Sequence, residues 1–140
     1  KIIKKNIVFE KNYWKISSAH DGYLKDYGII HDREVEFYPE QMKFIGYDKM
    51  ISKNIIKDLK FEIRFHLEPG AKIMKTKDNK SILVDLDGEG WKFNSTDNDI
   101  NIDNGLYFGK KNSFVDNQNI FIWGMTSDTN HTIKWEITKL

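Results

Sequence analysis

The sequence predicts an all-β protein folded as an antiparallel β-sandwich of many short strands. Apolar and polar residues alternate along most of the chain, aromatic residues make up 14% of the 140 residues, and turn residues separate the alternating runs at short intervals. Alternation with a period of two is typical of a half-buried strand, because successive side chains point to opposite faces of a sheet. Aromatic side chains favour such pleated surfaces. Short strands at regular spacing predict a sandwich or barrel.

The alternating runs give the expected strands in chain order. They are residues 34–38, 61–67, 82–87, 91–93 and 133–137. The run Ile120-Phe121-Ile122-Trp123 is apolar on both faces, which predicts a central strand or a strand covered by another domain. No linker, repeat or low-complexity segment interrupts the pattern, so residues 1–140 are expected to form a single domain.

Turn-forming residues fall between these runs. The expected turns are Asp21-Gly22, Pro39-Glu40, Pro69-Gly70, Asp78-Asn79, Asp87-Gly88-Glu89-Gly90, Asp103-Asn104-Gly105, Asp116-Asn117 and Asp128-Thr129-Asn130. Asn and Gly accept positive φ, so Asp103–Gly105 is predicted to be a tight hairpin. The stretch from Asp48 to Leu59 has some helical character, but Asn54 and the β-branched Ile55 and Ile56 favour a loop or a single turn.

Composition excludes several classes of protein. The 22 basic and 21 acidic residues are interleaved and leave a net charge of +1, whereas nucleic-acid binders carry a basic stripe. The chain has no cysteine, which excludes disulfides and thiolate zinc sites. It has no apolar run of about 20 residues that would span a bilayer, and no signal peptide. Because it starts at Lys1 rather than Met, we expect a processed chain or part of a longer one, periplasmic or cytoplasmic in a bacterium.

Two histidines lie within candidate polar surfaces. His31 and Arg33 are two residues apart and share one face of a strand, as do Arg64 and His66. If the two strands were neighbours, the four side chains would form a patch able to grip an anionic sugar through guanidinium groups. The simpler interpretation is the solvated or interdomain face of a half-buried sheet. None of the four histidines has the spacing of a helical metal site.

The segment His20-Asp21-Gly22-Tyr23 also has two interpretations. His20 can act as an acid or base near neutral pH, with Tyr23 as a proton donor. Alternatively, Asp-Gly forms the turn while His20 and Tyr23 bond to backbone groups and lock it. The four tryptophans lie in apolar runs, which favours core packing over sugar stacking, with Trp14 the least secure in the core. The acidic residues at 85–89 are read as a solvated turn rather than a calcium loop.

An ordered set of segments over nearly all 140 residues resembles one family of enzymes. The segments are Ala19–Tyr23, Ile30–Val35, Ile63–Pro69, Gly88–Phe93, Leu106–Gly109 and Ile133–Glu136. In order and separation they are similar to the C-terminal β-sandwich region of the heparinase II/III-like polysaccharide lyases.

The resemblance implies a function for the whole protein. The family joins an N-terminal α/α toroid to a β-sandwich and cleaves uronic-acid-containing polysaccharides by β-elimination. Its catalytic Asn, Tyr and His lie mainly in the toroid and at the start of the sandwich. A catalytic His and, in some members, zinc ligands lie in Gly-His-x-His-x-Asp, Val-Asp-Pro-Gly and His-Asn-Thr segments, which are absent here. The resemblance therefore implies no cofactor and no catalytic residue in this segment. The expected partners are the toroid of the same protein and an acidic polysaccharide.

On this view the chain completes the β-layer that packs on the toroid and shapes one wall of the cleft, without cleaving alone. His20, Tyr23, His31, Arg33, Arg64 and His66 are then substrate-facing or interdomain contacts. Two alternatives stay open. A free-standing carbohydrate-binding module would bind acidic polysaccharide through Trp14 or Arg33. A purely structural domain would show no dependence on saccharide.

Overall fold

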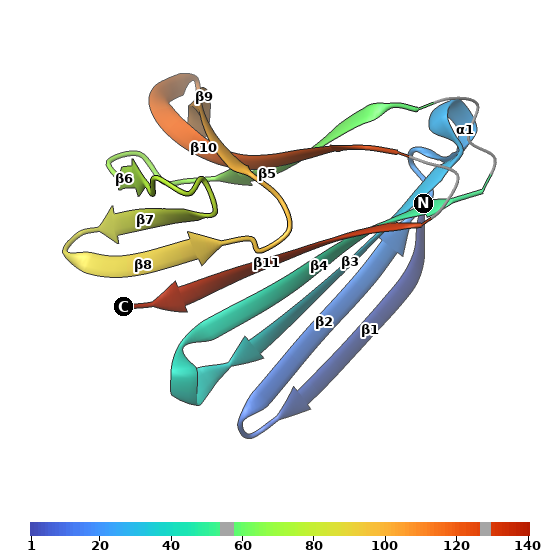
Figure 1. Ribbon diagram of the computed structural model, residues 1–140, viewed down its shortest axis with the longest axis horizontal. Helices are drawn as coiled ribbons and strands as arrows, with labels where there is room; N and C mark the ends of the chain where they lie inside the picture. The colour runs from blue at the N-terminus through green and yellow to red at the C-terminus, as the bar shows by residue number, and fades with distance from the viewer. Residues whose placement is uncertain (54–57, 127–129) are drawn as a thin grey trace.

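The computed structural model describes residues 1–53, 58–126 and 130–140, and within them the protein is all-β with two antiparallel sheets (Figure 1). The prediction of an antiparallel β-sandwich is confirmed. In spatial order, the large sheet consists of β1 (Ile2–Glu10), β2 (Tyr13–His20), β3 (Ile29–Tyr38), β4 (Lys43–Ser52), β11 (His131–Lys139), β8 (Glu89–Asn94), β7 (Ser81–Leu86) and β6 (Lys72–Lys75). The small sheet consists of β5 (Lys60–His66), β10 (Ser113–Met125) and β9 (Ile100–Lys110).

Two short helical turns join strands of the large sheet. Helix α1 (Leu24–Tyr27) links β2 to β3 and ends at Gly28, whose φ of 70° is the left-handed conformation that glycine adopts most easily. A 3₁₀ turn, η1 (Pro39–Gln41), links β3 to β4. No helix among the described residues has the length and apolar character needed to cross a membrane.

The core lies between the two sheets. Its most buried side chains come from both layers, with Ile82 and Ile133 on the large sheet and Ile100, Ile120 and Ile122 on the small one, all 1% exposed or less. The rings of Phe93 and Trp135 complete it. An added Cβ at Gly46 would overlap the Trp135 ring, so glycine is required where this indole crosses β4. As expected for an apolar run, Ile120–Trp123 lies in β10, the central strand of the small sheet.

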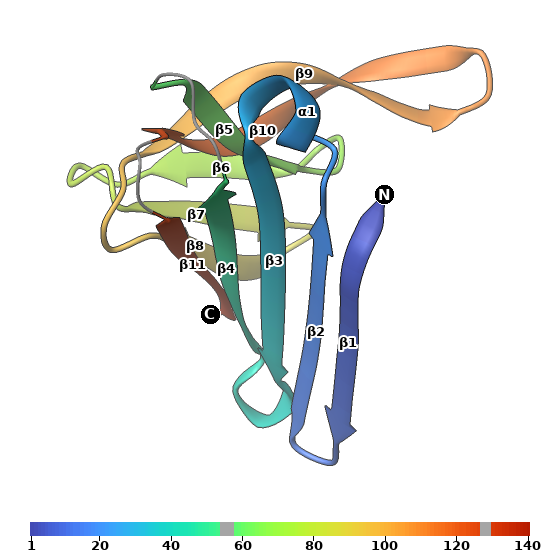
Figure 2. The same cartoon turned by 90° about the vertical axis from the view of Figure 1, so that its right-hand side faces the viewer.

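The small sheet covers only part of the large one. In Figures 1 and 2, β1 and β2 run away from the small sheet to ends that it does not reach. The β9–β10 hairpin in turn extends beyond the edge of the large sheet (Figure 2). The two layers therefore overlap in the middle of the molecule and each overhangs the other.

Several turn predictions are wrong. Asp103–Gly105 lies inside β9, and the hairpin closes at Lys111-Asn112, where Asn112 takes the positive φ of 59°. Gly105 instead makes room for the side chains of Asn117 and Asn119. Asn117 lies inside β10, buried, and donates to the Leu67 carbonyl at 2.7 Å, so Asp116-Asn117 is not a turn.

Residues 48–52 are also not a loop, because they form the end of β4 paired with β3 and β11. Residues 54–57 of that predicted loop, and residues 128 and 129 of the turn predicted at 128–130, lie outside the described residues. Asp87-Gly88 does form the expected turn, with positive φ at both positions as a type I′ hairpin requires.

The four tryptophans differ in how exposed their side chains are. Trp135 is buried in the core, Trp91 is half-buried, and Trp14 is 39% exposed. The prediction of core packing is wrong for Trp123, which is 46% exposed on the outer face of the small sheet. Its face of β10 has no layer over it among the described residues, whereas the opposite face carries Ile120 and Ile122.

Candidate functional site

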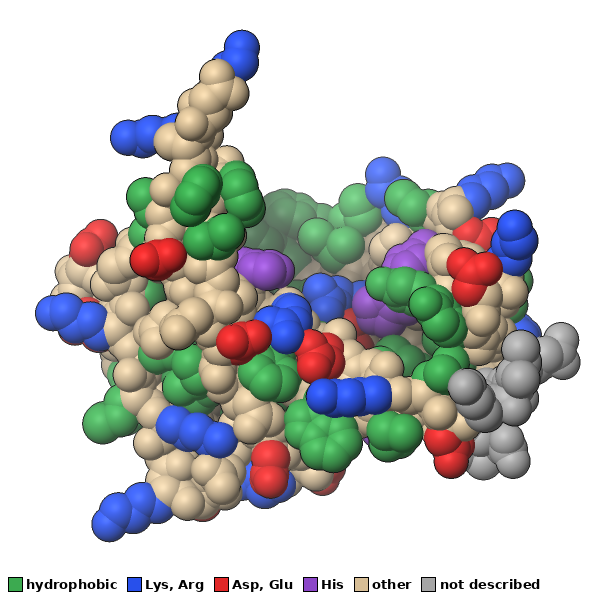
Figure 3. Space-filling model, turned by 90° about the horizontal axis from the view of Figure 1, so that it is seen from above, with side chains coloured by type: hydrophobic (Ala, Val, Ile, Leu, Met, Phe, Trp, Pro, Cys, Tyr) green, Lys and Arg blue, Asp and Glu red, His purple; other side chains and the backbone are tan. Residues whose placement is uncertain are grey.

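A pocket of about 480 Å³ opens where the edge of the small sheet faces β3 and α1. In the view from above, histidine, basic, acidic and hydrophobic side chains meet around this hollow (Figure 3). One wall comes from α1 and β3 and the other from β5, so segments far apart in the chain build it together. The lining residues include Tyr23, Tyr27, Ile29, His31, Arg33, Met50, Glu62 and Arg64.

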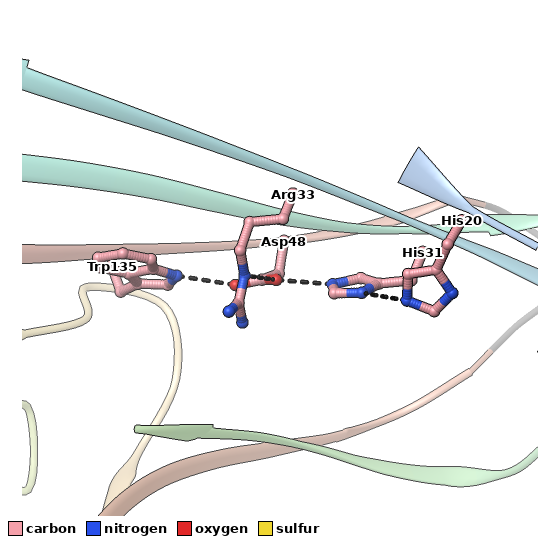
Figure 4. A network of polar contacts seen from close by, with 5 residues as sticks. All are labelled: His20, His31, Arg33, Asp48 and Trp135. Carbon is pink, nitrogen blue, oxygen red and sulfur yellow. Dashed lines mark hydrogen bonds and ion pairs between the residues drawn. The ribbon is translucent and has the colours of Figure 1, made fainter. Parts of the chain in front are cut away.

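A fully buried carboxylate anchors the β3 wall. Alternation along β3 turns His31 and Arg33 to the inner face of the sheet, beside Asp48 of β4. His31 Nε2 and Arg33 Nε both lie 2.7 Å from Asp48 Oδ1, and Trp135 Nε1 donates to Oδ2 at 2.8 Å (Figure 4). One carboxylate from β4 thus fixes side chains from β3 and β11.

These donors stabilise the negative charge of Asp48. Burial alone would raise the pKa of the Asp48 carboxyl, but hydrogen bonds from His31 and Arg33, with the Arg33 charge, outweigh it and lower the pKa. The carboxylate is therefore ionised at neutral pH. A buried charge of this kind is tolerated because each oxygen accepts a hydrogen bond.

The hydrogen bonds also define the tautomers of two histidines. A carboxylate only accepts, so His31 donates from Nε2, and its Nδ1 faces His20 Nε2 at 3.3 Å. His20 Nδ1 accepts the backbone N–H of Gly22 at 3.2 Å, so its proton is on Nε2 and is donated to His31. Hydrogen bonds thus run from His20 through His31 to Asp48. Burial, followed by the proximity of His31, lowers the pKa of His20, which is consistent with a neutral ring.

Arg33 presents a free edge to the pocket. Its Nε is taken by Asp48, whereas its two terminal amino groups have no hydrogen-bond partner among the described residues. The side chain is 40% exposed, and its guanidinium lies 5.9 Å from the centroid of the Phe65 ring. A guanidinium with one side anchored and the other open suits the oxygens of a carboxylate or sulfate.

Arg64 across the pocket is already engaged. Its Nη2 lies 2.7 Å from Glu62 Oε2, and its Nη1 lies 3.1 Å from Asp103 Oδ2. The hydrogen bond to Arg64, with that to Lys60, lowers the pKa of Glu62, so this wall carries ion pairs rather than a free cation. Arg33 is therefore better placed than Arg64 to bind an anion. Across the described residues no group of three or more His, Asp or Glu side chains is arranged to hold a metal ion.

Comparison with known families identifies the chain. A sequence profile described as "Heparinase II/III-like, C-terminal" matches residues 3–136. The chain belongs to this heparinase II/III-like family. No curated protein matches the sequence.

Solved structures of heparinase II/III-like type share the fold. The heparan sulfate lyase HepC from Pedobacter heparinus is similar over 99% of this chain, with a TM-score of 0.83 and 12% identity. A structure of heparinase III is similar over 100% of the chain, with a TM-score of 0.70 and 14% identity. The chain spans 22% and 21% of those two chains, about a fifth of their length.

In this heparinase II/III-like domain, the predicted site residues separate into two groups. Tyr23, His31, Arg33 and Arg64 line the pocket, and His20 lies behind His31 with its ring 5.2 Å from that of Tyr23. β3 and β5 belong to different sheets and do not pair, so the four-residue patch expected from neighbouring strands does not form. His66 does not line the pocket, although it shares a face of β5 with Arg64 and lies at the end of that strand. His66 points to the outer face of the small sheet, opposite Asn119. His20 accepts the Gly22 N–H, as the structural interpretation of its turn expected.

Sequence reasoning missed Asp48 and Trp135 as members of this site. Asp48 was assigned to a loop, and nothing local marks a single Asp as a buried anchor. Its partners are 15, 17 and 87 residues away in sequence. An acidic residue flanked by Tyr47 and Lys49 reads as a solvated position until the strand pairing is known.

Proposed function

We propose that this chain is the C-terminal β-sandwich domain of a polysaccharide lyase that cleaves uronic-acid-containing polysaccharide by β-elimination. It supports the catalytic α/α toroid and lines the cleft, and it is not catalytic alone. The observation that carries the proposal is the match of this family's C-terminal profile to nearly the whole chain, which spans only about a fifth of two solved lyases.

The chemistry of β-elimination defines what a domain that lines the substrate cleft can contribute. A base removes the proton from C5 of the uronate, the C4–O bond breaks, a C4–C5 double bond forms, and an acid protonates the leaving oxygen. The uronate carboxylate must be neutralised for C5 to become acidic. The free edge of Arg33 is suited to holding a carboxylate or sulfate of the bound chain. Both ring nitrogens of His31 are engaged, so His31 is a positioning residue that fixes Asp48 and, through it, Arg33.

The base, the acid and any zinc of the parent protein belong, on this proposal, to residues outside these 140. The toroid of the same protein is the partner that the domain packs against. Tyr23, Arg64 and the His20–His31 pair contribute the shape of the pocket rather than bond breaking.

The test uses the parent protein and measures formation of unsaturated uronate ends from acidic polysaccharide. We expect Arg33→Ala to raise KM by roughly 10- to 100-fold, the range for a lost charge-assisted hydrogen bond. The KM of Arg33→Lys should lie between those of the wild type and Arg33→Ala, because lysine keeps the charge but loses the paired donors of the guanidinium. Arg64→Ala, in the same pocket but already paired, is the matched control and should change KM little. Thermal unfolding of each variant separates binding from folding defects.

Other outcomes would overturn the proposal. A parent protein that cleaves no acidic polysaccharide would exclude the lyase assignment. Unsaturated ends produced by the 140 residues alone would show that the domain is catalytic. An unchanged KM in a folded Arg33→Ala parent would remove Arg33 from the substrate contact.

A stand-alone carbohydrate-binding domain is the second candidate. Trp14 is exposed, stacks on Phe9 at 4.8 Å and lies on the same face of the large sheet as Arg33. This function predicts that the domain by itself binds acidic oligosaccharide and loses affinity in Trp14→Ala and Arg33→Ala. No measurable binding by calorimetry would exclude it.

A further inference from the structure

The inner face of β1 and β2 carries a group of exposed apolar side chains, here named the apolar shelf. It consists of Ile7, Phe9, Trp14 and Ile16, which are 57%, 73%, 39% and 56% exposed. Ile7 pairs with Ile16 and Phe9 pairs with Trp14 across the two strands, so the four side chains form one patch. Soluble proteins rarely leave a contiguous apolar patch open without a partner for it.

The apolar shelf continues the core without a break. Ile16 pairs with Val35 and Trp14 pairs with Phe37 on β3. The Phe37 ring stacks on Phe44 with centroids 4.3 Å apart, and Phe44 packs against the buried core. The shelf is thus the same layer as the core, beyond the point where the small sheet stops covering it.

The opposite face of the same strands is polar. There Lys15 pairs with Glu34 at 2.9 Å, Lys4 pairs with Asp32 at 2.9 Å, and the Tyr13 hydroxyl donates to Glu36 at 3.0 Å. β1 and β2 therefore have one polar face with ion pairs and one apolar face, as a strand inside a sandwich has.

The small sheet overhangs in the same way. Leu106 continues the core-facing side of β9 and is 47% exposed. At the tip of the hairpin Phe108 and Phe114 are 70% and 62% exposed, with ring centroids 5.9 Å apart. In Figure 2 this hairpin extends to the right at the top, and the β1–β2 pair runs downward along the right-hand edge of the large sheet. Apolar surface from both layers is left open beyond their overlap.

We propose that the apolar shelf is an interdomain docking surface, covered by a segment of the parent lyase chain outside these 140 residues that extends the second layer. This inference rests on the proposed function. About four-fifths of the similar lyase chains lies outside the matched region, which gives ample chain to cover the shelf. The shelf is also continuous with the interface between the two sheets, so an added segment would extend a layer that already exists.

A second copy of the domain fits this surface less well. A two-fold contact would bring the same patch of both copies together. The shelf adjoins the part of the same sheet face that the small sheet already covers (Figures 1 and 2), so a second copy would have to fit its own shelf beside that layer. A segment of the parent chain has no such restriction.

Thiol labelling in the parent protein tests the proposal, since the 140 residues contain no cysteine. Asn6 and Ile7 are adjacent exposed residues of β1 on opposite faces, which makes Asn6→Cys the matched control for Ile7→Cys. We expect Ile7→Cys in the parent to react about tenfold or more slowly than Asn6→Cys, because a covered thiol reacts only after local opening. In the separately produced 140-residue chain the two rates should be similar. Ile16→Cys with Lys15→Cys repeats the comparison on β2.

Each other result overturns the proposal. Equal rates at Ile7→Cys and Asn6→Cys in the parent mean an open shelf. Protection that disappears on dilution identifies a second copy, and protection that appears only with added acidic oligosaccharide identifies a sugar platform. Labelling requires no catalysis. A protected shelf in an inactive parent therefore contradicts only the lyase assignment, and an open shelf in an active lyase contradicts only the docking surface.

Discussion

The covered and uncovered parts of the large sheet carry the same kinds of residue on the same face. Beneath the small sheet, Ile133 and Trp135 are 0% and 5% exposed, whereas on the apolar shelf Ile16 and Trp14 are 56% and 39% exposed. All four lie in strands with regular alternation. The comparison shows that burial depends on the second layer and not on the type of residue. An apolar side chain contributes to stability only to the extent that another layer removes it from water.

The largest expected effect comes from the two tryptophans of this face. Trp135→Ala should lower the free energy of unfolding by about 3–5 kcal/mol, because it removes a buried ring that contacts Phe65 and Phe93 and leaves Asp48 without one donor. Trp14→Ala should cost about 1 kcal/mol or less, since Trp14 is 39% exposed and its ring contacts Phe9 and Phe37, which lie beyond the cover of the small sheet. Urea denaturation measures both, and equal losses would mean that the shelf is as well packed as the core.

The second largest effect is expected at Asp48. Asp48→Asn should lower the free energy of unfolding by about 1.5–3 kcal/mol, because the hydrogen bonds from His31 and Arg33 lose their charged acceptor. The matched control is Asp103→Asn, which removes one partner of Arg64 at an exposed ion pair and should change stability by about 1 kcal/mol or less. A result in which the two variants behave alike would show that Asp48 is not a structural anchor.

The smallest effect is a dependence of stability on pH, which we expect from His20 at the end of the hydrogen-bond network of Asp48. Burial and His31 lower the pKa of His20 below 6.5, as does the N-terminal ammonium, while Asp21 opposes the shift. The unfolded chain then binds a proton at higher pH than the folded one. The stability due to a neutral His20 is present above pH 6.5 and is lost as the pH falls through the folded-state pKa.

His20→Gln tests this dependence, because it keeps a donor toward His31 and removes the titration. The fall in the free energy of unfolding between neutral and mildly acidic pH should become shallower. His66→Gln removes an exposed histidine from the outer face of the small sheet and is the control. If the pH dependence of the free energy of unfolding became shallower in His66→Gln than in His20→Gln, our assignment of that dependence to His20 would be wrong.

Much of the fold follows from local pattern. The alternation of the chain predicts strands within β3, β5, β7, β8 and β11, and the apolar run predicts β10, but no prediction covers β1, β2, β4, β6 or β9. The Asp87-Gly88 pair predicts a turn that forms with positive φ at both residues. The two-residue spacing of His31 and Arg33 predicts their common face, and they do meet at Asp48. Local pattern fails at Asn104-Gly105, where the same turn chemistry lies inside β9 because Gly105 makes room for two asparagines from the next strand.

The sequence by itself determined six of the eleven strands, the faces that their side chains share and the family to which the chain is similar. The strands and their faces depend on neighbouring residues and on the pleat of the backbone. Only the tertiary structure decided that Asp48 anchors His31, Arg33 and Trp135, that His66 points away from them, and that one part of an apolar sheet face is buried while the apolar shelf is not. Those outcomes depend on which distant strands lie over one another. The alternation of a single strand is the same whether or not a second layer covers it.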